Sequence, residues 1–437
     1  MRSGQTIRKH ASVVSALRSP TLAVVAALAL RIALLWASYH AVGANWKFHA
    51  LGLEEGRVAW SLANGKGFFG PFPGYETPTA WLAPVYPFLW AICIKLSHLN
   101  PALEILLGQI LNCLLSAATC WPIYSIGKKI FGWEAGLTSA WLWAILPHSI
   151  LLPVLWTWDQ NLAALALALI VDATLRLRDS RKPLAWTGYG LLWAFAALVN
   201  PTLCGVLPFL LGWLVYERRR LGSASLAPYA RALAVFVLAL LPWTIRNYYS
   251  VGGWFFVKSN FGLELWLGNH DPSLTMELHP MNSFSERFRL IFEGEADYNR
   301  QKKRMALAYI ESHPGAFLKN TWGRIQQTWT PASDPEMNGW APGPHLGRGF
   351  LLYCAAFSIV SLAGLILALR DKWINSLPLA MCLIVFPLPY YITHTGLRYR
   401  LPVDTFMAIF TAYGLCRLWS LFSVRPATER AQQAQSF

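Results

Sequence analysis

The sequence predicts an all-α polytopic membrane protein with about ten transmembrane helices, additional interfacial helices and a small, mainly helical cap outside the membrane. Of its 437 residues, 55% are hydrophobic and only 14% are charged, and the mean hydropathy is +0.36. A soluble domain has about a quarter of its residues charged. The hydrophobic residues gather in runs of about 20, the length that crosses a bilayer. Lysines and arginines flank these runs.

The first apolar run, 20–42, follows a basic N-terminus that extends from Arg2 to Arg18. A basic start before an apolar run also occurs in signal peptides, but their hydrophobic part is only about 7–15 residues long. We therefore predict that 20–42 is an uncleaved first transmembrane helix. Arg31 lies inside this helix and must either pair internally or snorkel toward the interface, because an unpaired charge in a membrane is costly.

Ten further apolar runs cover 82–97, 104–126, 134–155, 160–176, 184–199, 202–216, 230–246, 349–369, 375–392 and 402–421. If all of them cross, basic clusters such as Lys128-Lys129 fall on the outer side, against the positive-inside rule. Removing one crossing before residue 104 places these clusters inside. The weakest candidate is 82–97, which is short and contains Pro84, Pro87 and Lys95, so we interpret it as an interfacial or re-entrant helix.

The resulting topology has ten spanning helices with both termini inside, and it divides the chain into four parts. An N-terminal transmembrane module, 1–246, includes a first outer loop, 43–103. An outer segment, 247–348, follows, then C-terminal transmembrane helices, 349–421, and an inner tail, 422–437. Within the outer segment, helical spacing predicts a helix over 296–329 with a break at His313-Pro314, and 254–268 is interpreted as extended.

Three carboxylates fall on the outer side in this topology. Glu54 and Glu55 lie beyond the first helix, and Asp159 lies at the outer start of the helix that begins near Gln160. A carboxylate at the membrane surface can act as a general base toward an incoming hydroxyl. The alternatives are a solvated first helical turn for Glu54-Glu55 and a helix N-cap for Asp159.

Basic groups gather on the same side. His394, Arg398 and Arg400 lie in the predicted outer turn 393–401, and Arg246 and Lys258 lie at the start of the outer segment. Arginine binds phosphate in a bidentate manner, so we predict that this turn binds an anion. The alternative is that these arginines contact lipid head groups.

Several classes of protein and site are disfavoured. The net charge of +15 is concentrated at the ends of apolar runs, so it reflects topology and we expect no nucleic-acid partner. No phosphate-binding loop, dinucleotide fingerprint or zinc-protease motif is present. Most of the seven cysteines lie in apolar runs, and none has metal-ligand spacing.

The order of these motifs resembles that of the GT-C membrane glycosyltransferases, especially the protein O-mannosyltransferases and the aminoarabinose lipid A transferases. Glu54-Glu55 matches their Asp-Glu pair, and Asp159 in TWDQN matches their second acidic position. Further similar stretches are APVYP (83–87), PWTIRNY (242–248), SNFGLELWLGN (259–269), AYIESHPGAFL (308–318) and HTGLRYRLPVD (394–404).

The resemblance implies an enzyme that transfers a sugar, with inversion, from a polyprenyl-phosphate donor to a glycolipid, glycan or protein acceptor at the periplasmic face of a bacterial inner membrane. Glu54 would be the base, with Glu55 as the alternative, and Asp159 would orient the acceptor. Trp81 and Tyr86 would contribute to substrate binding. No cofactor is assigned and no metal ligand is named, although a divalent cation stays open. The rival functions are a lipid-linked polysaccharide ligase or polymerase, and a lipid-sugar flippase or transporter.

Overall fold

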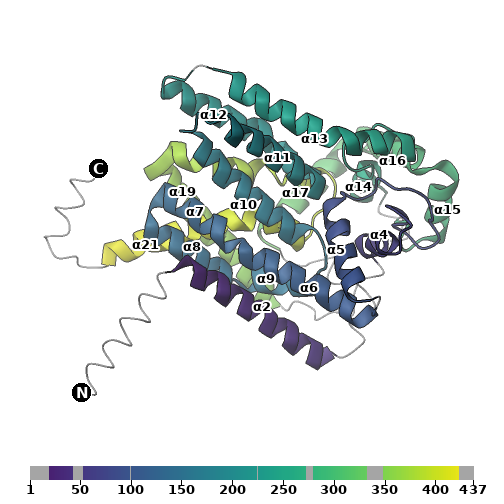
Figure 1. Ribbon diagram of the computed structural model, residues 1–437, viewed down its shortest axis with the longest axis horizontal. Coiled ribbons are helices and arrows are strands. Elements are labelled where there is room, and N and C mark those ends of the chain that lie inside the picture. Colours follow the sequence, from purple (N-terminus) through teal and green to yellow (C-terminus); the bar gives the residue numbers. More distant parts are fainter. Residues whose placement is uncertain are drawn as a thin grey trace.

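The computed structural model describes residues 19–42, 53–98, 100–223, 225–271, 279–331 and 348–422. Over these residues the chain is helical, apart from loops and one isolated β-bridge, so the predicted all-α class is confirmed. Long helices run side by side in a bundle, and shorter helices form a cap at one end (Figure 1). The described start of the chain lies at the opposite end of the bundle from the cap.

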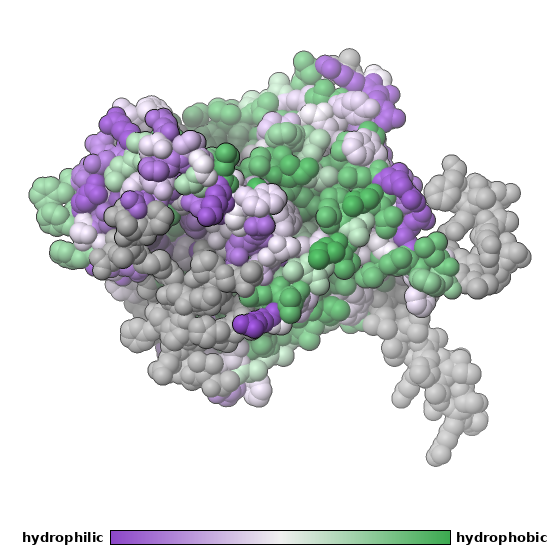
Figure 2. Space-filling view, turned by 180° about the vertical axis from the view of Figure 1, so that it is seen from behind, coloured by the Kyte–Doolittle hydropathy of each residue, from purple (hydrophilic) through white to green (hydrophobic). Residues whose placement is uncertain are grey.

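The bundle is formed by α2 (Pro20–Val42), α6 (Pro101–Ala118), α7 (Cys120–Phe131), α8 (Trp133–Ile145), α9 (Pro147–Leu155), α10 (Gln160–Leu177), α11 (Pro183–Val199), η2 (Pro201–Val206), α12 (Leu207–Arg220), α13 (Ala227–Val251), α19 (Arg348–Val385) and α21 (Leu401–Phe422). Figure 2 shows hydrophobic residues over the side of the bundle and hydrophilic residues at its two ends. A surface of this kind suits a bilayer with polar regions on both sides.

Six helical segments of the described chain are long and apolar enough to cross a membrane, and the bent pair α8–α9 makes a seventh. The chain is therefore a multi-pass membrane protein. One segment, Arg348–Ile392, has 45 residues and a non-helical break at Lys372, which is long enough for two spans of about 20 residues each. The count of ten spans stays a prediction, because it also requires the shorter segments 183–199 and 201–220 to cross.

The bend between α8 and α9 explains the buried Arg31. Pro147 has no backbone N–H, so the Trp143 carbonyl loses its normal helical partner. The Ser149 hydroxyl donates to this carbonyl at 2.6 Å, and Arg31 Nη2 donates to it at 3.2 Å. Arg31 also donates to the Ala144 carbonyl and to Ser116 Oγ. Its Nη2 also donates to Ser149 Oγ at 3.1 Å, so the arginine joins α2 to α6, α8 and α9 through neutral acceptors.

The cap begins with α4 (Glu54–Ala63), an aromatic loop and α5 (Val85–Leu96). At 1.5 Å per residue α5 is about 18 Å long, too short for a hydrocarbon core of about 30 Å. It lies beside α4 at the cap end of the bundle (Figure 1). This placement agrees with the interfacial helix predicted for 82–97.

The rest of the cap comprises α14 (Phe261–Gly268), α15 (Phe284–Glu293), α16 (Glu295–Ser312) and α17 (Pro314–Trp329). The predicted helix break at His313-Pro314 is confirmed. The extended structure predicted for 254–268 is wrong from Phe261 onward. There the chain forms a helix, because Leu263 and Trp266 are buried and α14 packs on α16.

A buried carboxylate ties the aromatic loop to the cap. Glu295 accepts hydrogen bonds from Thr79 Oγ1 at 2.6 Å, from the Ala80 amide at 2.8 Å and from the Ser259 hydroxyl. A carboxylate with several donors stays stable in the interior. Glu295 therefore fixes the end of the loop against the segment that leads into α14.

Candidate active site

Glu54 and Glu55 occupy the first turn of α4, and both are buried, so the solvated alternative is wrong for them. Glu54 Oε1 lies 3.5 Å from His279 Nε2. Burial lowers the pKa of His279, and the neighbouring Glu54 partly offsets this. His279 is therefore mainly neutral near pH 7, and Glu54 faces an imidazole rather than a fixed cation.

Asp159 precedes α10 but makes no capping hydrogen bond with its side chain. Instead, Asn200 Nδ2 donates to Asp159 Oδ2 at 3.1 Å. Asn200 is itself held in the turn after α11, where its side-chain oxygen accepts from the Thr202 amide. The structure thus favours a positioned carboxylate over the N-cap alternative. Burial raises the pKa of Asp159, and the positive charges of Lys258 and Arg398 partly offset the rise.

Glu55 points into the protein. Its Oε2 is buried and has no hydrogen-bond partner among the described residues. Burial raises the pKa of Glu55 well above its ordinary value, and the nearby Asp159 adds to the rise. Glu55 therefore holds its proton to a higher pH than an exposed glutamate does.

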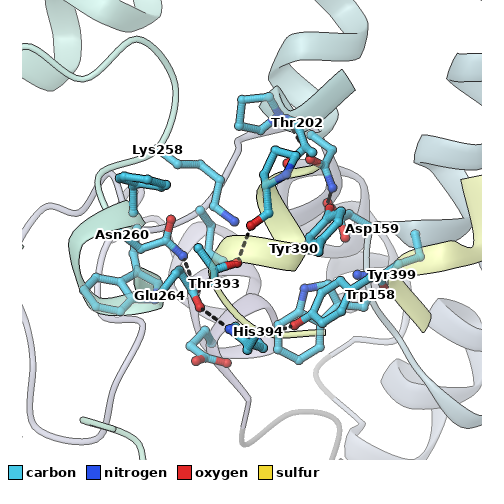
Figure 3. A pocket seen from close by; sticks show the side chains of 18 residues that line it. Trp158, Asp159, Thr202, Lys258, Asn260, Glu264, Tyr390, Thr393, His394 and Tyr399 are labelled. Carbon is cyan, nitrogen blue, oxygen red and sulfur yellow. Dashed lines mark hydrogen bonds and ion pairs between the residues drawn. The ribbon is translucent and has the colours of Figure 1, made fainter. Parts of the chain in front are cut away.

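A pocket of about 210 Å³ lies between the bundle and the cap (Figure 3). Its lining includes five of the predicted site residues, from five separate segments of the chain: Glu54, Trp81, Asp159, Lys258 and His394. Asn200, Glu264, Thr393 and Tyr399 also line it. The topology argument predicted a common side for these segments, and the fold brings them into one cavity.

His394 is held from two sides. Its Nδ1 lies 3.2 Å from Glu264 Oε2, and its Nε2 lies 3.0 Å from the Tyr399 hydroxyl (Figure 3). Asn260 Nδ2 donates to the other Glu264 oxygen at 2.6 Å. The imidazole orientation is thus fixed by α14 and by the turn that carries His394.

The turn itself, between α20 (Leu388–Ile392) and η3 (Leu397–Arg400), packs closely on the end of α14. A Cβ atom on Gly268 would lie 1.7 Å from the Thr393 carbonyl oxygen, so only glycine fits there. Asn269 Nδ2 donates to the Ile392 carbonyl at 2.7 Å, and Arg324 Nη1 donates to the Tyr391 carbonyl at 3.0 Å. These contacts fix one wall of the pocket.

The two arginines of the turn have different surroundings. The Arg398 guanidinium lies 4.3 Å from the centre of the Trp158 ring and 5.0 Å from that of Trp156. It contacts the Trp158 indole, which lines the pocket, and contributes positive charge near Asp159. Arg398 is therefore close to the site but is not among the residues that line it.

Arg400 is not brought to the pocket. Its side chain is fully buried, with Nε 2.8 Å from Asp404 Oδ1. Its Nη1 donates to Ser358 Oγ at 2.8 Å and to the Thr328 carbonyl at 3.0 Å. Asp404 also contacts His148 Nε2 at 3.2 Å. Since the burial of a charge requires such partners, Arg400 anchors η3 to the bundle.

Arg246 and Tyr86 also lie outside the pocket lining. Arg246 donates to the carbonyls of Phe68 and Thr79, which closes the base of the aromatic loop. The buried Tyr86 hydroxyl donates to Asn112 Oδ1 at 3.0 Å. Both residues were predicted to bind substrate, and in the structure their contacts hold the loop and the helices together.

Among the residues of the site that were not predicted from the sequence are Glu264, Asn200 and His279, the last of which contacts Glu54 without lining the pocket. Glu264 lies in the stretch SNFGLELWLGN, and Asn200 lies between the predicted apolar runs 184–199 and 202–216, so both had a local signal. His279 had none. Within the described ranges, no group of three or more His, Cys, Asp and Glu side chains is placed to hold a metal ion.

The family model described as dolichyl-phosphate-mannose-protein mannosyltransferase matches residues 81–245. The fold is similar to that of the oligosaccharyltransferase of Archaeoglobus fulgidus in its apo form, with a TM-score of 0.59 and 13% identity over 96% of this chain and 51% of that one.

The same archaeal enzyme, AglB, in complex with an inhibitory peptide and a dolichol-phosphate aligns with a TM-score of 0.58 and 15% identity, again over 96% and 51%. This chain spans about half the length of the archaeal protein. A comparison with curated protein sequences found no significant match. The family-model match and the shared fold confirm the predicted resemblance to the GT-C glycosyltransferase superfamily.

Proposed function

We propose that this chain is a membrane glycosyltransferase that moves a sugar, with inversion, from a polyprenyl-phosphate donor to an acceptor glycolipid, glycan or protein. The observation that carries the proposal is the pocket in which Glu54 and Asp159 lie with Lys258 and His394. The archaeal relative was solved with a dolichol-phosphate, which supports a lipid-phosphate donor here.

The reaction follows from the positions of the charged groups. Glu54 takes the proton of the acceptor hydroxyl, and the oxygen attacks the anomeric carbon of the donor sugar. The bond from that carbon to the phosphate oxygen breaks with its electron pair, and polyprenyl phosphate leaves. Attack from the face opposite the phosphate inverts the anomeric centre. Asp159, held by Asn200, orients the acceptor.

Lys258 is the best placed cation for the leaving phosphate, because its side chain lines the same pocket as Glu54. An ammonium group at this position stabilises the negative charge that develops as the bond breaks. Arg398, which contacts the ring of the pocket-lining Trp158, adds positive potential. We therefore assign the phosphate to Lys258 and Arg398, and we assign Arg400 to the support of the turn.

A transfer assay separates this function from its rivals. The full chain in proteoliposomes would receive a radiolabelled polyprenyl-phosphate hexose and acceptor lipids from bacterial membranes. We expect loss of label from the donor and its appearance in a second product. Movement of intact labelled donor across the bilayer, with no cleavage, would instead identify a flippase. The same assay with a chelator tests the alternative of a bound divalent cation.

We further propose that the pocket faces the periplasm of a bacterial inner membrane. The basic clusters lie at the other end of the bundle, as the positive-inside rule requires. In a cysteine-free background, an impermeant thiol reagent added to whole cells should label Glu76→Cys and Lys303→Cys. It should not label Lys128→Cys or Arg219→Cys. The reverse pattern would place the site in the cytoplasm.

A further inference from the structure

A second cavity lies beside α4, and none of its lining residues lines the candidate active site. Its volume is about 590 Å³, and small-molecule sites generally measure about 300–1,000 Å³. Arg57, Trp60 and Ser61 of α4 form one side, and Lys66, Phe69 and Tyr75 of the aromatic loop form the other. The mechanism proposed above uses none of these residues.

The loop wall of this cavity is preformed. Phe69 pairs with Pro78 in an antiparallel β-bridge, and the Gly70 amide donates to the Thr77 carbonyl. Gly70 has a φ of +67°, and a Cβ atom there would lie 2.9 Å from the Tyr75 carbonyl oxygen. Arg246 and Glu295 fix the ends of this loop, as described above. Because the wall is already ordered, a ligand loses little affinity to loop ordering.

The charge of the cavity favours an anion. Two cations, Arg57 and Lys66, line it with one carboxylate, Glu76. Arg57 Nη2 donates to the Phe72 carbonyl at 3.2 Å, while its buried Nε has no hydrogen-bond partner among the described residues. Burial lowers the pKa of Arg57, and the positive charge of the nearby Arg287 lowers it further. An anion would relieve this crowding of positive charge.

The aromatic groups favour a sugar ring over a bare ion. Trp60 is 43% exposed although it lies on a helix of the cap. Lys66 Nζ lies 5.7 Å from the centre of its ring, so the indole and a cation stand together. A flat apolar ring beside hydrogen-bond donors suits a ligand with one apolar face and several polar groups, which is the character of a sugar.

The position of the cavity connects it to the reaction. Glu54, Arg57 and Ser61 are three and four residues apart, so they share one face of α4. At 1.5 Å per residue, Arg57 lies about 4.5 Å and Ser61 about 10 Å along the axis from Glu54. A chain of sugars that presents a hydroxyl to Glu54 can therefore extend toward this cavity.

We propose that the cavity beside α4 binds an anionic sugar unit of the acceptor glycan, with Arg57 and Lys66 on its acidic group and Trp60 against its ring. This inference rests on the proposed function, because it names the acceptor of that reaction. An acidic peptide is the competing ligand, and the test below includes it.

The test measures binding to the purified full chain in detergent, in the absence of donor, by titration calorimetry or saturation-transfer NMR. The probes are a disaccharide of glucuronate and glucose, the neutral disaccharide with glucose in place of glucuronate, and a blocked tripeptide with a central aspartate. We expect the acidic disaccharide to bind at least about tenfold more tightly than the neutral one, as hydrogen bonds to a charged group provide.

Variants locate the site. Lys66→Met and Arg57→Gln should each bring the ratio of acidic to neutral affinity down by about tenfold. Trp60→Ala should weaken both disaccharides together. The matched control is Lys303→Met, which removes a positive charge from an exposed position of the same cap, outside the cavity. It should leave the affinity ratio unchanged.

Three results would overturn the inference: equal affinity for the two disaccharides, an unchanged ratio in Lys66→Met, or tighter binding of the tripeptide than of either sugar. The binding test is independent of transfer. If the chain binds the acidic disaccharide selectively, loses that selectivity in Lys66→Met and never cleaves donor, then the proposed function is wrong and the binding site is still supported. Transfer without selective binding would remove only this site.

Discussion

The acids of the active-site pocket and those at the basic end of the bundle have different partners. At the basic end, Asp172 forms ion pairs with Lys129 and Arg176, and Glu217 pairs with Arg220 at 3.1 Å. At the pocket end, the contacts of Glu54 and Asp159 are an imidazole and an amide. Full charge pairing stabilises a fold but reduces the basicity of a carboxylate. In contrast, the direct contacts of the two pocket acids involve no fixed positive charge.

The largest effect should come from the acid that faces the pocket. Glu54→Gln keeps the size of the side chain and removes its basicity, so transfer should fall by at least about a hundredfold, the contribution of a general base. The measurement is the initial rate of transfer in proteoliposomes at matched protein levels.

The matched control is Asp172→Asn, which makes the same change of charge at the other end of the bundle. Its transfer rate should stay near that of the wild type, although it breaks two ion pairs. If Glu54→Gln were active, or if both variants lost activity to the same extent, the functional difference between the two ends would disappear.

The second effect compares the two arginines of one turn. Arg400→Met removes the ion-pair partner of the buried Asp404, and such a change costs about 3–5 kcal/mol of stability. We expect little folded protein by size-exclusion chromatography. Arg398→Met should keep normal levels and weaken apparent donor affinity. Normal levels of Arg400→Met with lost donor affinity would restore Arg400 as a phosphate ligand.

Much of the architecture could be predicted because its signals are local. Pro314 has no N–H for the preceding helix and suits the first turn of the next one, so the break at His313 could be predicted. Lysines and arginines at the ends of apolar runs indicate the topology. The different roles of Arg398 and Arg400 were not predicted, because two arginines in one turn look alike when each is considered alone. The spacing of four between Arg400 and Asp404 was an available signal for an ion pair.

The pocket residues show the same limit. Glu54 and Asp159 each begin a helix, so their positions could be predicted. The contacts of His279 with Glu54 and of Glu264 with His394 join residues more than a hundred positions apart. Tertiary packing decides such pairs, and no local pattern encodes them.

A smaller effect concerns the support of Asp159. Asn200→Ala removes the amide that stabilises the charged form of this carboxylate, so the pKa of Asp159 should rise further. If Asp159 acts as an anion, the acidic limb of the pH–rate profile should move to higher pH, with a loss of about tenfold for one hydrogen bond to a charged group. A uniform loss at every pH would indicate a structural role instead.

The smallest effect tests whether Glu55 is neutral, in contrast to the paired acids of the basic end. A raised pKa in the folded state means that the folded protein binds this proton more strongly than the unfolded chain does. Stability from Glu55 is then full below the unfolded pKa of about 4.3 and is lost as the pH rises through the raised folded value.

Glutamine imitates the protonated acid and does not titrate. Relative to Glu55→Gln, the wild type should therefore lose apparent melting temperature as the pH rises from 4 to 8, while transfer at neutral pH stays similar in the two proteins. A wild type that gains stability over this range would show an ionised, stabilised Glu55, and loss of transfer in Glu55→Gln would move the base to that position.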